Sequence, residues 1–421
     1  MKVPFNRPYL TGHEQEALAR VLEGRHLSGN GPFTRACQSW LEDRLGCKRA
    51  LLTHSGTGAL EMAAILADLQ PGDEVIMPSF TFVSTANAFV LRGAVPVFID
   101  VRTDTLNLDE SRIEAAITDR TRAIVPVHYA GVGCAMDPIM EVANRHGLIV
   151  IEDAAQGILS AYKGRRLGSL GHLAAMSFHE TKNVTSGEGG ALLINDERFL
   201  SRAEIIWEKG TNRAGFARGE VDKYTWLDIG SSFLPGEVVA AFLFAQLEEA
   251  AALIERRLGI WHAYHRAFEG LERAGALTRP VVPEGCTPNG HIYYLVLPDL
   301  EARTALIAGL RARGIAALFH YVPLHDSPAG RRYGRPHGDL AVTRAAGDRL
   351  VRLPVWVGMG EEVGWVIDAV LAHLTARGSG RKVPRPHIPL GTPAAPGAAA
   401  DPLAPAHGRG RTPKPQEADG P

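Results

Sequence analysis

Seven short runs of β-favouring residues alternate with helical stretches over the first 200 residues of this chain. Two of the runs, VPVFIDV and LIVIEDA, are apolar over nearly their whole length, with no polar alternation. Strands of this kind are buried on both faces, which is typical of a mostly parallel sheet covered by helices. The pattern therefore predicts an α/β fold with strands at 50–53, 74–77, 95–101, 123–128, 148–152, 174–178 and 191–194.

The pattern changes after about residue 235. A long stretch rich in Ala, Leu, Glu and Arg predicts a helix over 237–269, with Gly270 as its stop. Two further strands, at 292–297 and 317–321, are expected on either side of a helix over 301–313. We therefore predict a large α/β domain over residues 1–235 and a smaller α+β domain over 236–376. The segment 377–421 has few large apolar side chains and is expected to be a disordered tail.

Composition excludes several classes of protein. The 421 residues carry a formal net charge of -1, so no basic field indicates nucleic-acid binding. No apolar run approaches the ~20 residues of a membrane helix, and the first residues lack the apolar core of a secretory signal. Four scattered cysteines form no C-x-x-C pair, and the chain has no HExxH motif. We expect a cytoplasmic protein without a metal site.

The first candidate site is the segment SGTGALEMAA, residues 55–64, which directly follows a predicted strand. Glycines and hydroxyls at a strand-to-helix turn leave backbone N–H groups free at a helix N-terminus, where a phosphate binds. The segment is not a Walker A loop, because no Gly-Lys-Ser/Thr follows. A plain tight turn is the alternative interpretation.

The second candidate is IEDAAQG, residues 151–157, where two acids end an apolar strand. Open α/β sheets build their ligand crevice at the carboxyl ends of strands. A carboxylate there can pair with the protonated nitrogen of a pyridine ring, which needs such a partner to act as an electron sink. Alternatively, Asp153 is simply the N-cap of a helix.

The third candidate is SFHETKNVTSGEGG, residues 177–190, which contains Lys182. A lysine held near a phosphate and a cationic ring becomes a nucleophile towards an aldehyde when its pKa is lowered. A solvated surface charge is the alternative. In chain order the three segments offer a loop that can bind a phosphate, an acid that can pair with a ring nitrogen, and a reactive lysine. Phe80 or Phe82, between the first two segments, could stack on a flat ring. Together they indicate pyridoxal 5'-phosphate (PLP), with Lys182 carrying it.

The chain resembles the fold-type I, PLP-dependent nucleotide-sugar aminotransferases of the DegT type. The similarity covers about residues 3–375 and is carried by these segments: GDEVIMPSFTFVSTANAFVLRGA, IVPVHYAG, EDAAQG, SFHETKN, EKGTNR, VDKYTW, DIGSS and FHYVPLH. The resemblance implies that Lys182 binds the cofactor and moves the proton, while Asp153 pairs with the ring nitrogen. It further implies that residues 1–235 form the PLP-binding domain. Other cofactor contacts would be Gly56, Thr57 and Ser177 at the phosphate, Gln156 at the ring hydroxyl and Phe82 on the ring.

The resemblance also implies a substrate and a homodimer. The substrate would be dTDP-4-keto-6-deoxy-D-glucose, aminated with glutamate to dTDP-4-amino-4,6-dideoxy-D-galactose for surface polysaccharide synthesis. Alternatives are another nucleotide-linked keto sugar (GDP-4-keto-6-deoxymannose or a 3-keto sugar) and a non-catalytic PLP-binding regulator. Many relatives reach the partner's cofactor phosphate through an Asn; here that segment reads GSSFL, and the resemblance implies that Ser232 would take this role. The sugar nucleotide would be bound by Lys209, Arg213, His320, Tyr321 and His325.

Overall fold

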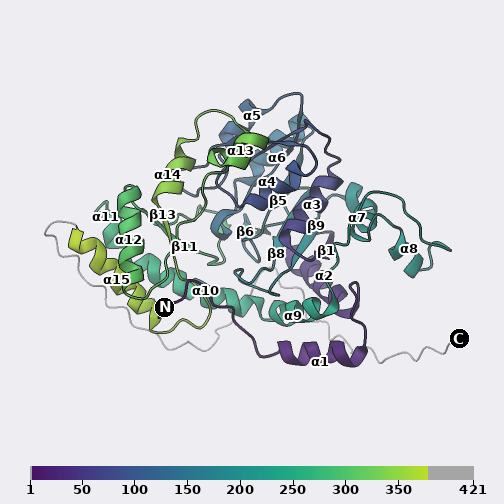
Figure 1. Ribbon diagram of the computed structural model, residues 1–421, viewed down its shortest axis with the longest axis horizontal. Helices are drawn as coiled ribbons and strands as arrows, with labels where there is room; N and C mark the ends of the chain where they lie inside the picture. Colours follow the sequence, from purple (N-terminus) through teal and green to yellow (C-terminus); the bar gives the residue numbers. More distant parts are fainter. Residues whose placement is uncertain (1, 378–421) are drawn as a thin grey trace. The chain divides into compact units, whose positions relative to one another are not determined.

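A sheet of eight strands forms the centre of this protein, whose computed structural model describes residues 2–377 (Figure 1). The strands lie in the order β1-β9-β8-β5-β4-β2-β3-β12. Their bounds are β1 (Arg49–Thr53), β2 (Glu74–Pro78), β3 (Val95–Ile99), β4 (Thr121–Ile124), β5 (Ile149–Asp153), β8 (Leu173–Ser177), β9 (Gly190–Ile194) and β12 (Arg335–Pro336). Each of the seven predicted strands overlaps one of these, and the α/β prediction is confirmed.

Only β9 runs against its neighbours in this sheet. It pairs antiparallel with β1 and with β8, whereas every other pairing is parallel. The sheet is therefore mixed but mostly parallel. As a result, the carboxyl ends of β1, β2, β4, β5 and β8 lie along one edge of the sheet, and the loops that follow them meet there.

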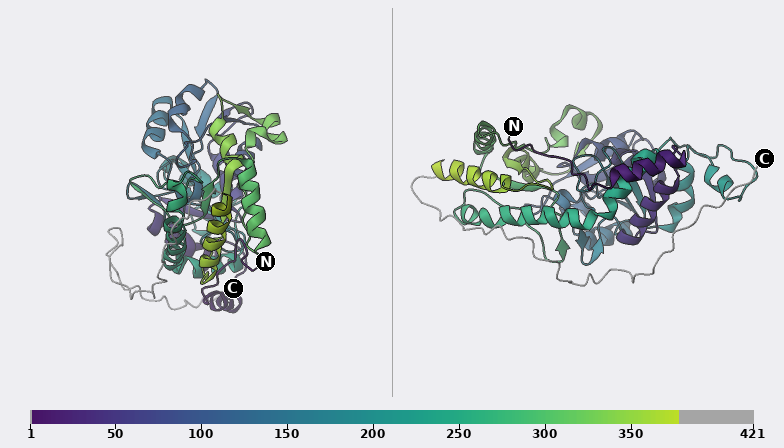
Figure 2. Two further views of the ribbon diagram at one scale, coloured as in Figure 1. Left: turned by 90° about the vertical axis from the view of Figure 1, so that its left-hand side faces the viewer. Right: turned by 90° about the horizontal axis from the view of Figure 1, so that it is seen from below.

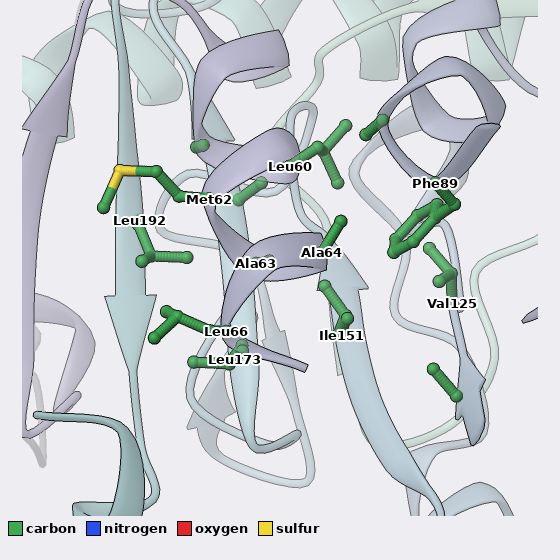
Figure 3. Packing of buried hydrophobic residues seen from close by; sticks show 14 of the residues in the cluster. Leu60, Met62, Ala63, Ala64, Leu66, Phe89, Val125, Ile151, Leu173 and Leu192 are labelled. Carbon is green, nitrogen blue, oxygen red and sulfur yellow. The ribbon is translucent and has the colours of Figure 1, made fainter. Parts of the chain in front are cut away.

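Both faces of the sheet are buried, as the apolar runs predict. Along β9, Leu192 and Ile194 pack on one side and Ala191 and Leu193 on the other, because successive side chains point to opposite faces. Figure 3 shows the first side, where helix α3 (Gly56–Leu66) places apolar side chains against β9, β8 and β5. The second side is covered by three helices: α2 (Pro32–Leu45), α6 (Met136–His146) and α9 (Glu237–Glu248).

The long helix predicted after residue 236 is divided into three. Helix α9 is followed by α10 (Ala250–Ala267) and α11 (Glu269–Arg273). The predicted stop at Gly270 is wrong, because this glycine lies inside α11. The left-handed residue that follows the helix is Gly275, with φ of 71°.

A second, two-stranded sheet belongs to the C-terminal half. Strands β11 (Tyr293–Val296) and β13 (Leu350–Leu353) pair antiparallel. Beside them lie α12 (Leu300–Ala312) and α15 (Glu362–Arg377), and α15 also packs on α10 (Figure 2). The predicted strand over 317–321 is wrong: Leu318 makes a single bridge to Arg352, and the chain then leaves the sheet.

The remaining elements are short or peripheral. They are α1 (Glu14–Gly24), α4 (Val83–Val90), α5 (Ile113–Ala116), α7 (Leu200–Trp207), α8 (Arg213–Ala217), α13 (Pro328–Tyr333), α14 (Ala341–Arg349), β6 (Ala161–Tyr162), β7 (Arg165–Arg166) and β10 (Cys286–Thr287). Among the described residues, no helix is long and apolar enough to cross a bilayer. Of the predicted tail, Arg377 is the last residue of α15 and 378–421 lie outside the described residues.

Candidate active site

The N-terminus of α3 lies against the carboxyl end of β8. Ser55 caps the helix, and its side chain accepts a 3.0 Å hydrogen bond from the Gly58 N–H. A Cβ at Gly56 would lie 2.8 Å from the Ser177 Cβ, so only glycine allows this approach. Thr57 shares a 2.7 Å hydrogen bond with Ser84 of α4. The first turn of α3, Ser177 and Thr57 thus lie together, and they are the residues from which a phosphate cradle is predicted.

Asp153 is the last residue of β5 and is 6% exposed. One carboxylate oxygen accepts a 2.6 Å hydrogen bond from the Thr85 hydroxyl, and the other accepts a 3.2 Å bond from the Ala155 N–H. No helix begins at this position, so the helix-cap alternative is wrong for Asp153. Its carboxylate is fixed at the edge of the sheet.

The adjacent acid, Glu152, points to the other face of β5. It is fully buried, and its carboxylate accepts hydrogen bonds from the His128 ring at 2.8 Å and from three backbone N–H groups of residues 168–171. Burial opposes the charged form, but these donors outweigh it and lower the pKa of Glu152. The two acids therefore have separate surroundings, and Asp153 alone borders the site.

Lys182 lies on the connection between β8 and β9. The Phe178 N–H donates to the Gly189 carbonyl at 2.8 Å, and the Lys182 N–H donates to the His179 carbonyl at 2.9 Å. The side chain is partly buried, and within residues 2–377 its amine makes no hydrogen bond or ion pair. Burial lowers the pKa of Lys182; the charge of Asp153 opposes this shift and that of Arg352 adds to it. Lys182 is thus a lysine with an amine that is more readily neutral than usual.

A buried histidine lies beside Lys182. The Nδ1 atom of His291 is 2.9 Å from the Asn183 side-chain oxygen. Burial, followed by the charges of Lys182 and Arg257, holds the pKa of His291 well below its ordinary value, so the ring is neutral. Sequence reasoning missed His291, because a single histidine before a strand carries no motif.

Aromatic rings and an amide form a wall of the site. His320 stacks on Tyr321 at 3.7 Å between ring centroids, and its Nδ1 is 2.7 Å from the Tyr129 hydroxyl. The side-chain amide of Gln156 donates to the Tyr321 hydroxyl at 3.1 Å and accepts from the Ala130 N–H at 2.7 Å. The structure therefore brings together Gln156, His320 and Tyr321, which are predicted from separate segments.

The two candidate stacking rings lie in different environments. Phe80 is 1% exposed and packs edge-on against the rings of Tyr129 and Tyr321. Phe82 is 58% exposed at the N-terminus of α4. Only the Phe82 ring is accessible to a ligand, which favours it over Phe80.

Within residues 2–377, the other predicted contacts make no hydrogen bond or ion pair with Lys182. His325 is buried and shares a 2.7 Å hydrogen bond with Ser79. Lys209, Arg213 and Ser232 are exposed on the segment that contains α8, on the far right of Figure 1. Within this segment Ser232 bridges to Glu208, and no described contact joins Ser232 to the cradle.

Comparison with known proteins decides the family. Residues 8–371 match the model of the DegT/DnrJ/EryC1/StrS aminotransferase family. The chain belongs to this family. It is 34% identical over 383 residues to GDP-perosamine synthase of Caulobacter vibrioides, covering 89% of this chain and 97% of that protein. It is 33% identical over 380 residues to the spore coat polysaccharide biosynthesis protein SpsC of Bacillus subtilis, covering 87% and 96%.

Solved structures agree with the family. The aminotransferase TlmJ of Streptoalloteichus hindustanus superposes with a TM-score of 0.81 at 29% identity, over 90% of this chain and all of that one. A Streptococcus pneumoniae protein assigned as a sugar aminotransferase and solved in a PLP form gives a TM-score of 0.81 at 25% identity, over 89% and 99%. DegT-family aminotransferases depend on PLP, and this chain is such an enzyme.

The residues present fit PLP. The first turn of α3, pressed against Ser177, offers N–H groups to a phosphate. Asp153 offers a fixed carboxylate to a ring nitrogen, and the amine of Lys182 has no partner in the described chain. Within residues 2–377 no cluster of His, Cys, Asp or Glu has the arrangement of a metal site.

Proposed function

We propose that this enzyme transfers an amino group from glutamate to dTDP-4-keto-6-deoxy-D-glucose, giving dTDP-4-amino-4,6-dideoxy-D-galactose for polysaccharide synthesis. The observation that carries the transamination is the unpaired, partly buried amine of Lys182 close to Asp153. The choice of sugar is supported by the segments KGTNR, VDKYTW and FHYVPLH, which are separate in sequence from the cofactor motifs. A cytoplasmic location stays a prediction.

We propose that residues from four segments of the chain hold the cofactor. When bound, PLP supplies a conjugated ring that withdraws electrons from the reacting carbon. Asp153 holds a proton on the ring nitrogen, and Gln156 contacts the ring hydroxyl. The cradle of Gly56, Thr57 and Ser177 holds the phosphate, and Phe82 stacks on the ring.

Lys182 performs the acid–base step in this proposal. Its Nζ would hold the cofactor in the resting enzyme. As a neutral amine it would accept the proton from the α-carbon of the amino donor. In the second half-reaction it moves a proton in the reverse sense, towards the sugar carbon. A positioned base of this kind typically contributes ~10²–10⁴-fold to the rate.

We infer that a second copy of the chain completes the site. Large side chains are exposed on the segment that carries α8: Phe216, Tyr224, Leu227, Ile229 and Trp226, the last 78% exposed. Such a run marks an interaction surface. Ser232 of the same segment would then contact the partner's phosphate, while Lys209 and Arg213 would bind the sugar nucleotide with His320, Tyr321 and His325.

A GDP-linked sugar is the second candidate. It is favoured by the 34% identity to GDP-perosamine synthase. The alternative of a non-catalytic regulator has no support in these comparisons.

The substrate is tested by incubating the enzyme with glutamate and a panel of nucleotide-linked keto sugars, with products identified by mass and by stereochemistry of the amine. We expect turnover with dTDP-4-keto-6-deoxyglucose. Turnover with GDP-linked sugars alone, or amination at C3, would overturn the choice of sugar and leave the transamination intact.

The cofactor lysine is tested by trapping. The purified protein should be yellow, and borohydride should fix a phosphopyridoxyl group on the peptide that contains Lys182, because its amine has the lowered pKa. The exposed amines of Lys163 and Lys209 are internal controls. A label on either of them in place of Lys182 contradicts the assignment.

A further inference from the structure

Arg352 lies in β13, beside the aromatic wall of the site. It stands opposite Tyr294 in the β11–β13 pair, and its backbone bridges to Leu318 on the other side. The Arg352 N–H donates to the Leu318 carbonyl at 2.7 Å. These contacts place the arginine next to residues 319–321, which include His320 and Tyr321.

The guanidinium of Arg352 has only neutral partners. Its Nε and Nη2 both donate to the Phe319 carbonyl, at 3.4 and 3.1 Å, and the group stacks over the Phe5 ring at 4.8 Å. No carboxylate of residues 2–377 lies within 4 Å of it. By contrast, the guanidinium of Arg335 makes two hydrogen bonds to Glu74. A partly buried cation without a counter-charge is costly, unless a ligand supplies the anion.

A fully buried arginine, Arg257, also lacks a carboxylate partner. Its guanidinium donates to the carbonyls of Gly290 and His291 and is enclosed by the chain, so it acts as a structural cation. Arg352 differs because it is only partly buried, and its Nη1 donates to no described residue. Its free donor is therefore available to a ligand.

The positive charge of Arg352 acts on the ionisable groups around the reactive amine. After burial, the positive charge of Arg352 contributes to lowering the pKa of Lys182 and of His320. It also depresses the pKa of His291. The only acid whose charge raises the pKa of Lys182 is Asp153. The region around the reactive amine thus favours an anionic ligand.

We propose that Arg352 binds a carboxylate of the amino donor. This inference rests on the proposed transamination. In an amino acid the α-carboxylate is one bond from the carbon that reacts at Lys182. In a nucleotide 4-keto sugar the diphosphate is attached across the ring from the reacting carbon. An unpaired guanidinium held at the Phe319 carbonyl, next to His320 and Tyr321, therefore matches the donor better than the diphosphate, and its planar group with two parallel donors suits a carboxylate.

The test measures two ligands on the cofactor-loaded enzyme. Glutarate, a dicarboxylate that has no amine and cannot react, probes the donor site, and dTDP probes the nucleotide site. For Arg352→Gln we expect the Kd of glutarate and the KM of glutamate to rise roughly 10- to 100-fold, the usual effect of losing a charged hydrogen-bond pair. The Kd of dTDP should change less than about twofold.

Two variants serve as comparisons. Arg352→Lys keeps the positive charge but loses the two parallel N–H donors of the guanidinium, and it should bind glutarate with intermediate affinity. Arg256→Gln removes an exposed arginine that stacks on Tyr9, and should leave both ligands unaffected.

Unchanged glutarate binding in Arg352→Gln would overturn the inference. So would a loss of dTDP binding equal to or greater than that of glutarate, because the guanidinium would then serve the diphosphate. Unaltered enzyme that consumes glutamate but aminates no sugar nucleotide refutes the proposed acceptor alone, and leaves the role of Arg352 standing.

Discussion

At the scale of single residues, Glu152 and Asp153 show how two neighbouring acids acquire different tasks. Strand geometry points them to opposite faces. Glu152 meets His128 and three backbone N–H groups, whereas Asp153 meets Thr85 and the site. Both acids could be predicted from the motif EDAAQG and the resemblance favours Asp153, but only the tertiary contacts give the physical reason why Asp153 borders the site.

This difference predicts opposite outcomes for two isosteric changes. Asp153→Asn should keep the fold, because the Thr85 hydroxyl can still donate to the amide oxygen. Turnover should fall by at least ~10²-fold as the charge opposite the ring nitrogen is lost. Glu152→Gln should instead lower the free energy of unfolding by about 2–4 kcal/mol, because it breaks a fully buried pair. Thermal unfolding and turnover, measured on both variants, distinguish the two roles.

The stability effect of Glu152 also depends on pH. Its pKa in the folded protein is lowered, so its contribution is fully present above the pKa of an unfolded glutamate and is lost as pH falls through the folded pKa. The difference in stability between the natural protein and Glu152→Gln should therefore shrink in acid. A difference that grows with acidity contradicts this account.

Two site residues carry no local signal at all. His291 and Arg352 lie in segments without a motif, and each reaches the site through long-range packing. Lys182 and Asp153 are different, because glycine-rich or acidic loops at strand ends surround them. Loop chemistry can be predicted from the sequence, whereas contributions from the second sheet require the fold.

At the scale of elements, the position of α3 depends on a glycine in a neighbouring strand. A Cβ at Gly190 would lie 2.4 Å from the Ser55 carbonyl carbon and 2.5 Å from the Gly56 nitrogen. The start of the helix is thus pressed directly onto β9. This contact sets where the N–H groups of the cradle point.

Gly190→Ala should displace the N-terminus of α3. We expect weaker PLP binding by at least ~10-fold and a loss of about 1–3 kcal/mol in stability from overpacking against backbone. Gly259→Ala is the matched control, since Gly259 lies within α10 with nothing within 4 Å. That change should stabilise the protein by about 0.5–1 kcal/mol. Equal effects of the two substitutions would contradict the role given to Gly190.

The wrong element predictions have physical causes. The residues of the segment 317–321 favour a strand, but the backbone makes only a bridge at Leu318. The next carbonyl, that of Phe319, accepts a hydrogen bond from the Arg352 side chain. Gly270 is accommodated in a helix whose stop is Gly275, five residues later. Both errors arise where tertiary contacts override local preference.

At the scale of the whole molecule, the exposed apolar segment around α8 predicts a homodimer. Trp226→Ser combined with Leu227→Ser should shift the sedimentation of the protein towards the monomer, because both side chains are more than half exposed in the single chain. Turnover should fall with dimer content if Ser232 acts across the interface. An active monomer rules out a shared site.

Complementation gives a sharper test of the shared site. Ser232→Asp should repel the phosphate, and Lys182→Ala removes the reactive amine, so each chain alone should be inactive. A heterodimer has one site with both residues intact. Random mixing should therefore restore about a quarter of the normal activity. No recovery despite heterodimer formation would mean that Ser232 and Lys182 act in the same chain.

The order of the strands has a consequence for synthesis on the ribosome. Strand β9 joins β1 to β8, so the sheet edge that holds Asp153 and Lys182 is complete once Ile194 has emerged. Arg352, the residue we assign to the amino donor, is translated more than 150 residues later, roughly 8–30 s at ordinary elongation rates. The sheet edge at the cofactor and the residue assigned to the amino donor are therefore made at well-separated times during translation.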